Sequence, residues 1–136
     1  MLMSAERPQR YLDASALVKL IVREPESEAL ERWLRQSGGD VVSCALVRTE
    51  VVRAASPRGA EAVLRARRLL DRLDLIILDD ELLDLAGELV GPLRSLDAVH
   101  VAAALELGDE LEAFVTFDRQ MTRAAESLGL PVVAPA

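Results

Sequence analysis

The chain has 136 residues, about the size of one domain, and at that length roughly two-thirds of the unfolded chain's surface can be buried. Hydrophobic residues make up 51% but aromatic residues only 3%, so the core has to be built from Leu, Val, Ile and Ala, and stacking platforms for bases are excluded. The net charge of −7 argues against a general nucleic-acid-binding surface and fits a site made of carboxylates. We predict a single domain over residues 1–136.

The chain carries no targeting or membrane signal. Residues 1–10 are polar and include no apolar run that could be a signal peptide, and no later run is long enough to cross a membrane. The single cysteine, Cys44, cannot form an internal disulfide and lacks the partners of a zinc site. This fits a reducing compartment, so we expect a cytoplasmic protein in which Cys44 is a small core residue.

Short apolar strands alternate with helical segments along the chain. Strands are predicted at residues 11–12, 41–43, 75–78, 113–117 and 132–133. Helices are predicted at residues 16–22, 26–36, 45–55, 60–72, 81–90, 95–107 and 119–128. The alternation is typical of right-handed βαβ crossovers, so we predict an α/β fold, a three-layer α/β/α sandwich with a mostly parallel central sheet.

Two aspartates lie where such a sheet binds its ligands, just beyond the carboxyl ends of strands. Asp13 follows the first predicted strand, and Asp118 follows the strand predicted at residues 113–117. Either carboxylate could instead be a helix N-cap that accepts the first N–H groups of the next helix. Asp13 can do both, because one oxygen can cap while the other faces the cleft.

Two further acidic residues lie within predicted helices. Three of the four helical neighbours of Glu50 are apolar, so it lies at the edge of a buried stripe, although a surface pair with Arg53 is the alternative. Asp97 is in the first turn of the most apolar helix, where it also suits the helix dipole, with Ser95 as N-cap. His100 lies one turn further on the same face, and we expect a hydrogen-bonded packing residue more than a catalyst.

These acidic residues occur within four short motifs. The motifs are Tyr-Leu-Asp-Ala-Ser-Ala-Leu-Val-Lys at residues 11–19, the helix that carries Glu50, Leu-Arg-Ser-Leu-Asp-Ala-Val-His-Val-Ala at 93–102, and Val-Thr-Phe-Asp-Arg at 115–119. In this order and spacing they resemble the PIN-domain ribonucleases, in particular the VapC toxins of bacterial toxin–antitoxin pairs, over residues 11–133. The resemblance implies an acidic catalytic site of Asp13, Glu50, Asp97 and Asp118, with Ser15 and Thr116 as supporting hydroxyls.

The chemistry implied is metal-dependent hydrolysis of RNA. Mg²⁺ or Mn²⁺ can generate a nucleophile from water at neutral pH and offset charge on the phosphoryl group, and both ions prefer oxygen ligands. We therefore expect Asp13, Glu50 and Asp97 to be metal ligands, directly or through water, and Asp118 to bind a second ion or to orient metal-bound water. Without metal the four carboxylates would repel one another, which would raise some of their pKa values. The resemblance further implies an endoribonuclease that cleaves single-stranded or looped RNA.

The sequence indicates the residues that contact the substrate and the partners less clearly than it indicates the acidic site. Five arginines lie close together in the sequence and are candidates for RNA contact, namely Arg58, Arg65, Arg67, Arg68 and Arg72. A solvated helix face is an equal alternative. The resemblance implies a homodimer and a cognate VapB-type antitoxin whose C-terminal segment covers the cleft. The pairs at residues 79–80 and 109–110 are expected to be cap and loop residues.

Other readings of the acidic residues fit the sequence less well. A phospho-acceptor receiver domain needs paired acidic residues after its first strand and a lysine near its last, whereas Leu12 precedes Asp13 and the only lysine is Lys19. A haloacid-type phosphatase needs an aspartate in place of Ser15. A catalytically silent PIN scaffold stays open, although the complete acidic set argues against it.

Overall fold

The central feature of the protein is one five-stranded sheet. A computed structural model describes residues 7–136, so most of the N-terminal segment discussed above lies outside the described residues. The strands are β1 (Gln9–Leu12), β2 (Asp40–Cys44), β3 (Asp74–Ile76), β4 (Leu111–Val115) and β5 (Val132–Val133). They lie in the order β3-β2-β1-β4-β5, and every neighbouring pair is parallel. The predicted α/β fold is confirmed, with a sheet that is wholly parallel.

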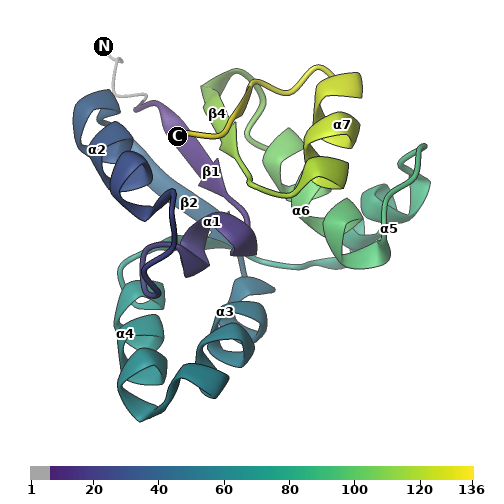
Figure 1. Cartoon of the computed structure of the whole chain (residues 1–136). Coiled ribbons are helices and arrows are strands. Elements are labelled where there is room, and N and C mark those ends of the chain that lie inside the picture. The colour runs from purple at the N-terminus through teal and green to yellow at the C-terminus, as the bar shows by residue number, and fades with distance from the viewer. Residues whose placement is uncertain (1–6) are drawn as a thin grey trace.

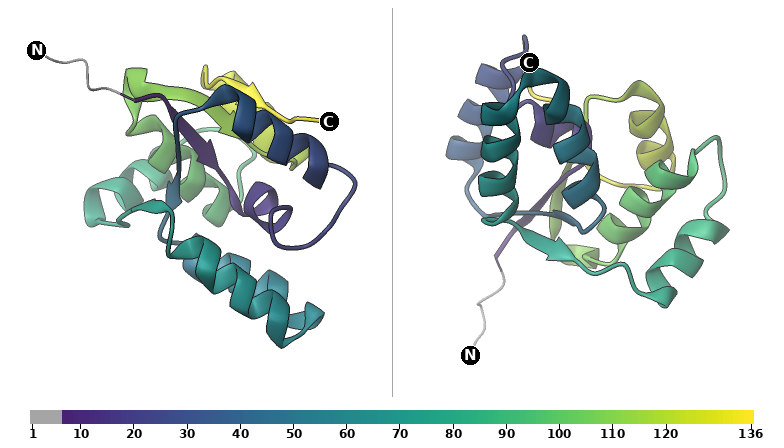
Figure 2. Two further views of the ribbon diagram at one scale, coloured as in Figure 1. Left: turned by 90° about the vertical axis from the view of Figure 1, so that its left-hand side faces the viewer. Right: turned by 90° about the horizontal axis from the view of Figure 1, so that it is seen from below.

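Helices cover both faces of this sheet (Figures 1 and 2). They are α1 (Ala14–Val18), α2 (Ser27–Ser37), α3 (Val47–Ala55), α4 (Ala60–Leu70), α5 (Asp80–Glu88), α6 (Ser95–Leu105) and α7 (Arg119–Ser127), with 3₁₀ turns η1 (Ser56–Arg58) and η2 (Gly108–Glu110). The antiparallel pair α3 and α4 extends away from the sheet (Figure 1). Between residues 7 and 136, no helix has the length and apolarity needed to cross a membrane.

The two faces of the sheet form two hydrophobic cores. In β1, Leu12 packs into the core beneath α1–α4, whereas Tyr11 packs into the core beneath α5–α7. Strand β4 alternates in the same way, with Val115 on the first side and Phe114 on the second. This follows from the two-residue period of a strand, and helices on both faces leave no polar face on the central strands. Cys44 is fully buried in the second core, as predicted.

Three local predictions differ from the structure. Helix α1 begins earlier, because Asp13 caps it, and after Val18 the chain continues in tighter turns with i to i−3 bonds. Strand β3 is an edge strand that ends at Ile76, so Ile77 is 76% exposed rather than covered by helices. Helix α6 has Arg94, not Ser95, at its N-cap position.

The topology places two loops side by side at the centre of the sheet. From β1 the chain moves through β2 to β3 on one side, and β4 and β5 lie on the other side. The strand order therefore reverses between β1 and β4, which is the switch point where parallel α/β sheets bind ligands. The Asp13 N–H donates to the Val115 carbonyl over 3.2 Å, so the carboxyl ends of β1 and β4 are tied together.

Candidate active site

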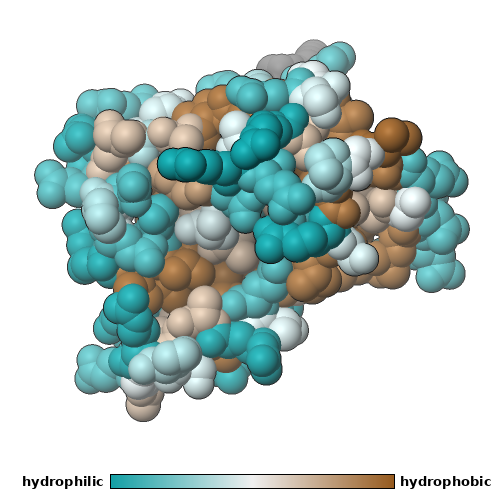
Figure 3. Space-filling model, turned by 45° about the vertical axis from the view of Figure 1, so that its right-hand side comes forward, coloured by the Kyte–Doolittle hydropathy of each residue, from teal (hydrophilic) through white to brown (hydrophobic). Residues whose placement is uncertain are grey.

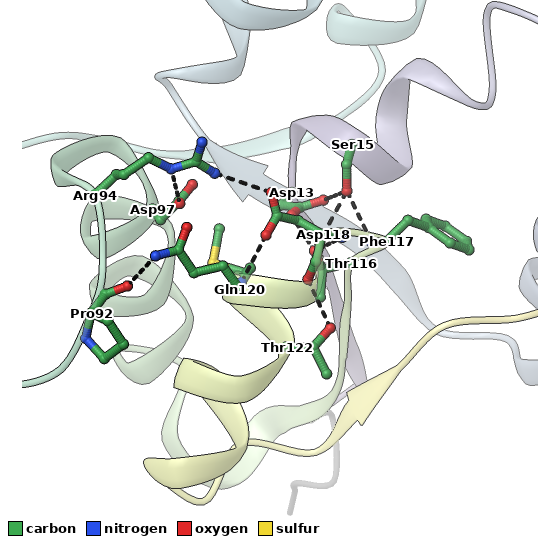
Figure 4. A network of polar contacts seen from close by, with 11 residues as sticks. Asp13, Ser15, Pro92, Arg94, Asp97, Thr116, Phe117, Asp118, Gln120 and Thr122 are labelled. Carbon is green, nitrogen blue, oxygen red and sulfur yellow. Dashed lines mark hydrogen bonds and ion pairs between the residues drawn. The ribbon is translucent and has the colours of Figure 1, made fainter.

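A pocket at this switch point brings together all four carboxylates singled out in the sequence. It has a volume of about 180 Å³ and is lined by Asp13, Ala14, Ser15, Glu50, Asp97, His100, Asp118 and Met121. The carboxylates come from the N-cap of α1, from α3, from the first turn of α6 and from the N-cap of α7. Residues far apart in the sequence therefore converge, as the close view in Figure 4 shows for three of the four.

Asp13 is the most buried of the four, with only 3% of its surface exposed. Its Oδ1 accepts the Ala16 N–H at 3.0 Å and the Ser15 hydroxyl at 2.7 Å, and its Oδ2 accepts the Thr116 hydroxyl at 2.5 Å. Burial raises the pKa of Asp13, although the two hydroxyls oppose this shift. Asp13 is therefore both the N-cap of α1 and one of the carboxylates of the pocket.

The two predicted supporting hydroxyls also order the backbone around Asp118. Ser15 Oγ accepts the Phe117 N–H at 3.0 Å, and Thr116 Oγ1 accepts the Asp118 N–H at 3.1 Å (Figure 4). Each hydroxyl therefore donates to Asp13 and accepts from the loop after β4. This double use fixes the position of Asp13 relative to that loop, which carries Asp118.

Glu50 is held from the core by a histidine. His100 Nε2 lies 2.7 Å from Glu50 Oε1, and because a carboxylate can only accept, Nε2 carries the proton. Glu50 is partly exposed, whereas His100 is buried. The alternative surface pair of Glu50 with Arg53 does not occur among the ion pairs of residues 7–136. His100 is the hydrogen-bonded packing residue that the sequence indicates, and it also lines the pocket.

The far side of the His100 ring contacts the second core. Nδ1 lies 2.7 Å from the Tyr11 hydroxyl and 3.8 Å from Cys44 Sγ. Burial alone would lower the pKa of His100, but the Cys44 thiol and the Glu50 carboxylate raise it to about 10. This raised pKa favours the protonated form of the buried ring next to Glu50.

The remaining two carboxylates are bridged by an arginine. Arg94 Nε donates to Asp97 Oδ2 at 2.9 Å, and its Nη2 donates to Asp118 Oδ2 at 3.1 Å (Figure 4). Asp118 Oδ1 caps α7 by accepting the Met121 N–H at 2.9 Å. Within the part of the chain that the structure describes, no three Asp, Glu, His or Cys side chains are grouped closely enough to hold a metal ion as they stand.

Residues 10–127 match the PIN domain family. The chain belongs to this family. It is 51% identical to Ribonuclease VapC46 of Mycobacterium tuberculosis over 126 residues, which cover 92% of this chain and 96% of the relative. Ribonuclease VapC47 of the same species is 40% identical over 131 residues, with the same coverage. The chain is therefore a PIN-domain ribonuclease of the VapC type, as the sequence motifs suggested.

Solved structures confirm the fold of this PIN domain. The Mycobacterium tuberculosis VapC20, described as a toxin that cleaves the sarcin–ricin loop, superposes with a TM-score of 0.75 at 18% identity, covering 93% of this chain and 99% of that one. Rickettsia felis VapBC2, solved with a DNA fragment from its promoter, gives a TM-score of 0.66 at 15% identity and covers 94% and 99%. At these identities the likeness establishes the three-layer architecture.

The predicted RNA-contact arginines of this PIN domain are all exposed, but none lines the pocket. Arg58 is on η1, three of the others are on α4, and Arg72 follows α4. Within α4, Arg65 Nε donates to the Ile21 carbonyl at 3.1 Å. The structure thus brings the four carboxylates together, whereas the five arginines lie outside the pocket, on or next to the helix pair α3 and α4 that extends away from the sheet.

A larger hollow elsewhere is a weaker candidate for the active site. It measures about 520 Å³ and is lined by Asp79, Glu81, Asp84, Leu85, Glu88 and Glu106. No hydroxyl, imidazole or basic group lines it, and Asp79 caps α5 through the Leu82 N–H, as predicted for a cap residue. The smaller pocket combines carboxylates with an imidazole and the Ser15 hydroxyl at the switch point, so it is the stronger candidate.

Sequence reasoning missed Arg94 as part of the PIN-domain site. Its spacing of three residues from Asp97 near a helix start is typical of an ion pair and could have indicated that contact. The contact with Asp118, 24 residues further on, depends on the tertiary fold and has no local signal.

Proposed function

We propose that this PIN domain is a Mg²⁺- or Mn²⁺-dependent endoribonuclease and the toxin of a VapBC-type toxin–antitoxin pair. The observation that carries the proposal is the convergence of Asp13, Glu50, Asp97 and Asp118 on one pocket. Carboxylate oxygens are the ligands that these hard cations prefer, so the donor set fits. The VapC ribonucleases that the chain resembles support the toxin role.

In the proposed mechanism the four carboxylates would hold the cation directly or through water. A divalent ion there supplies a nucleophile from water at neutral pH and offsets charge on the phosphodiester. Ser15 and Thr116 keep Asp13 in place, and His100 holds Oε1 of Glu50, which also lines the pocket. Asp97 in the first turn of α6 and Asp118 at the N-cap of α7 both line the pocket, so the positive ends of two helix dipoles border it, which favours an anionic phosphate.

We place the antitoxin in a groove that adjoins the pocket. The groove has a volume of about 400 Å³ and shares Ser15 and Glu50 with the pocket, while Val18, Ala54 and Phe117 add apolar surface. A segment seated there would cover the approach to the carboxylates. Figure 3 shows hydrophobic areas between hydrophilic ones on one face of the molecule. We further propose that the chain forms a homodimer, as the resemblance to VapC toxins implies.

The first test is RNA cleavage with controlled metal. The purified protein, free of antitoxin, is incubated with total RNA and with Mg²⁺, Mn²⁺ or a chelator. We expect cleavage with either metal and none with the chelator, and cleavage that persists under chelation would contradict the metal dependence. If no condition gives cleavage, the silent-scaffold alternative is favoured instead.

The toxin role has a separate test in cells. Expression of the chain alone should arrest growth, and co-expression of the neighbouring upstream gene should relieve the arrest. Growth that continues during expression of a protein active on RNA in vitro would contradict the toxin role but leave the nuclease activity intact.

A further inference from the structure

The loop that carries Arg94 is anchored to α7 next to the acidic pocket. This loop, residues 91–94, precedes α6, and Gln120 Nε2 of α7 donates to the Pro92 carbonyl at 2.6 Å (Figure 4). Arg94 occupies the N-cap position of α6 but makes no capping bond with its side chain. Its guanidinium is therefore available for the two carboxylates that begin α6 and α7.

The guanidinium occupies oxygens that a metal ion would need. Both of its bonds go to Oδ2 atoms, one of Asp97 and one of Asp118. The other oxygen of Asp118 already accepts a backbone N–H, so its Oδ2 is the atom with more freedom to bind a cation. A divalent cation at these oxygens would meet the guanidinium charge at hydrogen-bond distance, and the two cations would repel each other.

The two ion pairs of Arg94, with Asp97 and with Asp118, are also weak enough to break. The Arg94 side chain is 64% exposed, and exposed ion pairs contribute little because water screens them and ordering the long side chain costs entropy. Asp13 and Glu50 make no bond to Arg94. A cation could therefore approach these two carboxylates while Arg94 still holds Asp97 and Asp118.

We propose that Arg94 is a built-in competitor of the divalent cation, which holds Asp97 and Asp118 in the metal-free protein and releases them when the cation binds. This rests on the proposed metal-dependent function of the pocket. Arg94 then sets the metal concentration at which the four carboxylates can act together.

The test is Mn²⁺ binding to the metal-free full-length protein, measured by isothermal titration calorimetry without RNA. For Arg94→Gln we expect Mn²⁺ to bind about three- to tenfold more tightly than to the wild type, the range for displacing two exposed ion pairs. Arg94→Lys keeps the charge but loses the fork that reaches both carboxylates, so its affinity should be intermediate. Gln120→Ala frees the loop and should also tighten binding.

The matched control is Arg23→Gln. Arg23 Nη1 contacts both oxygens of Glu31 at 3.0 Å, so this variant removes an exposed arginine–carboxylate pair and the same charge without touching the pocket. Its Mn²⁺ affinity should stay within about twofold of the wild type, because salt screens remote charges. Equal affinity of wild type and Arg94→Gln would overturn the proposal for Arg94 alone. Absence of Mn²⁺ binding in every variant would overturn the metal-dependent function itself.

Discussion

His100 Nε2 donates to Glu50 Oε1 across 2.7 Å, and this bond links the core beneath α5–α7 to the acidic pocket. The ring is held on its other side by the Tyr11 hydroxyl, 2.7 Å from Nδ1, and by the edge-on packing of the two rings. Tyr11 of the first strand and Glu50 of the pocket are therefore linked through a buried histidine. Positioning of this kind acts on function without contact with the substrate.

Removal of the His100 Nε2 donor should reduce both the rate of RNA cleavage and the stability of the protein. We expect His100→Leu to lower RNA cleavage about 10- to 100-fold, because Glu50 loses its fixed orientation. The free energy of unfolding should fall by about 1–3 kcal/mol, since the buried Tyr11 hydroxyl loses its partner. His100→Gln retains an N–H donor and should recover most of the activity. Equal losses of activity in both variants would contradict a positioning role for Nε2.

The stability of the protein should depend on the protonation of His100. Its folded pKa of about 10 lies above the ordinary value of 6.5, so the folded state favours the proton. The stabilisation is fully present below about pH 6.5 and is lost as the pH rises through about 10. Urea unfolding of wild type and His100→Gln from pH 6 to 10 should show a difference in unfolding free energy that shrinks with rising pH. A constant difference would contradict this assignment.

Neutralising Asp13 should stabilise the metal-free protein. Burial raises its pKa, so its contribution to stability is present at low pH, below the ordinary pKa of an aspartate, and is lost as the pH rises through the folded pKa. Asn at this position can still accept the Ala16 N–H and can donate to Thr116. We therefore expect a higher Tm for Asp13→Asn than for the wild type at pH 7 in a chelator, measured by differential scanning calorimetry.

The control for this change is Asp79→Asn on α5. Asp79 is an exposed N-cap that accepts the Leu82 N–H at 2.9 Å, and Asn caps about as well as Asp. Its Tm should match the wild type. A Tm of Asp13→Asn at or below that of the control would show that burial of the Asp13 charge does not limit stability.

The arginines on α4 give a prediction about RNA binding. Arg67→Gln combined with Arg68→Gln should weaken binding to all single-stranded RNA sequences alike, and reduce the slope of log K against log salt by about 1.4. Arg32→Gln combined with Arg35→Gln on α2 removes the same charge from another exposed helix. Fluorescence anisotropy in a chelator measures both pairs without cleavage. Equal effects would indicate a general charge effect rather than an RNA-contact surface on α4.

Much of the fold follows from patterns within single segments. The alternation of short apolar strands with helices predicts parallel crossovers, and the positions of Asp13 and Asp118 after β1 and β4 predict their meeting at the switch point. Asp79 and Cys44 also behave as their local context indicates. Helix starts are less predictable, because a side chain such as Asp13 can cap one or two residues before the apolar pattern begins.

The contacts that define the site chemistry are the part that local patterns leave open. The partner of Glu50 is His100, 50 residues away, and not Arg53, the alternative partner within the same helix. Arg94 bonds to Asp118 between the loop before α6 and α7, and the bond from Gln120 to Pro92 joins the same two elements. Which residues become partners of Glu50 and Arg94 depends on how the helices pack on the sheet. The spacing of residues within one helix does not specify this packing.

The most direct test of the central claim is the rate of cleavage of one RNA substrate at saturating Mn²⁺ by a panel of single variants. Asp13→Asn, Glu50→Gln, Asp97→Asn and Asp118→Asn should each reduce the rate about 100-fold or more, since each removes a proposed ligand of the catalytic cation. Asp79→Asn, which changes a helix cap outside the pocket, should cleave at the wild-type rate. Cleavage that survives both Asp13→Asn and Asp97→Asn would contradict the claim that these carboxylates form one catalytic site.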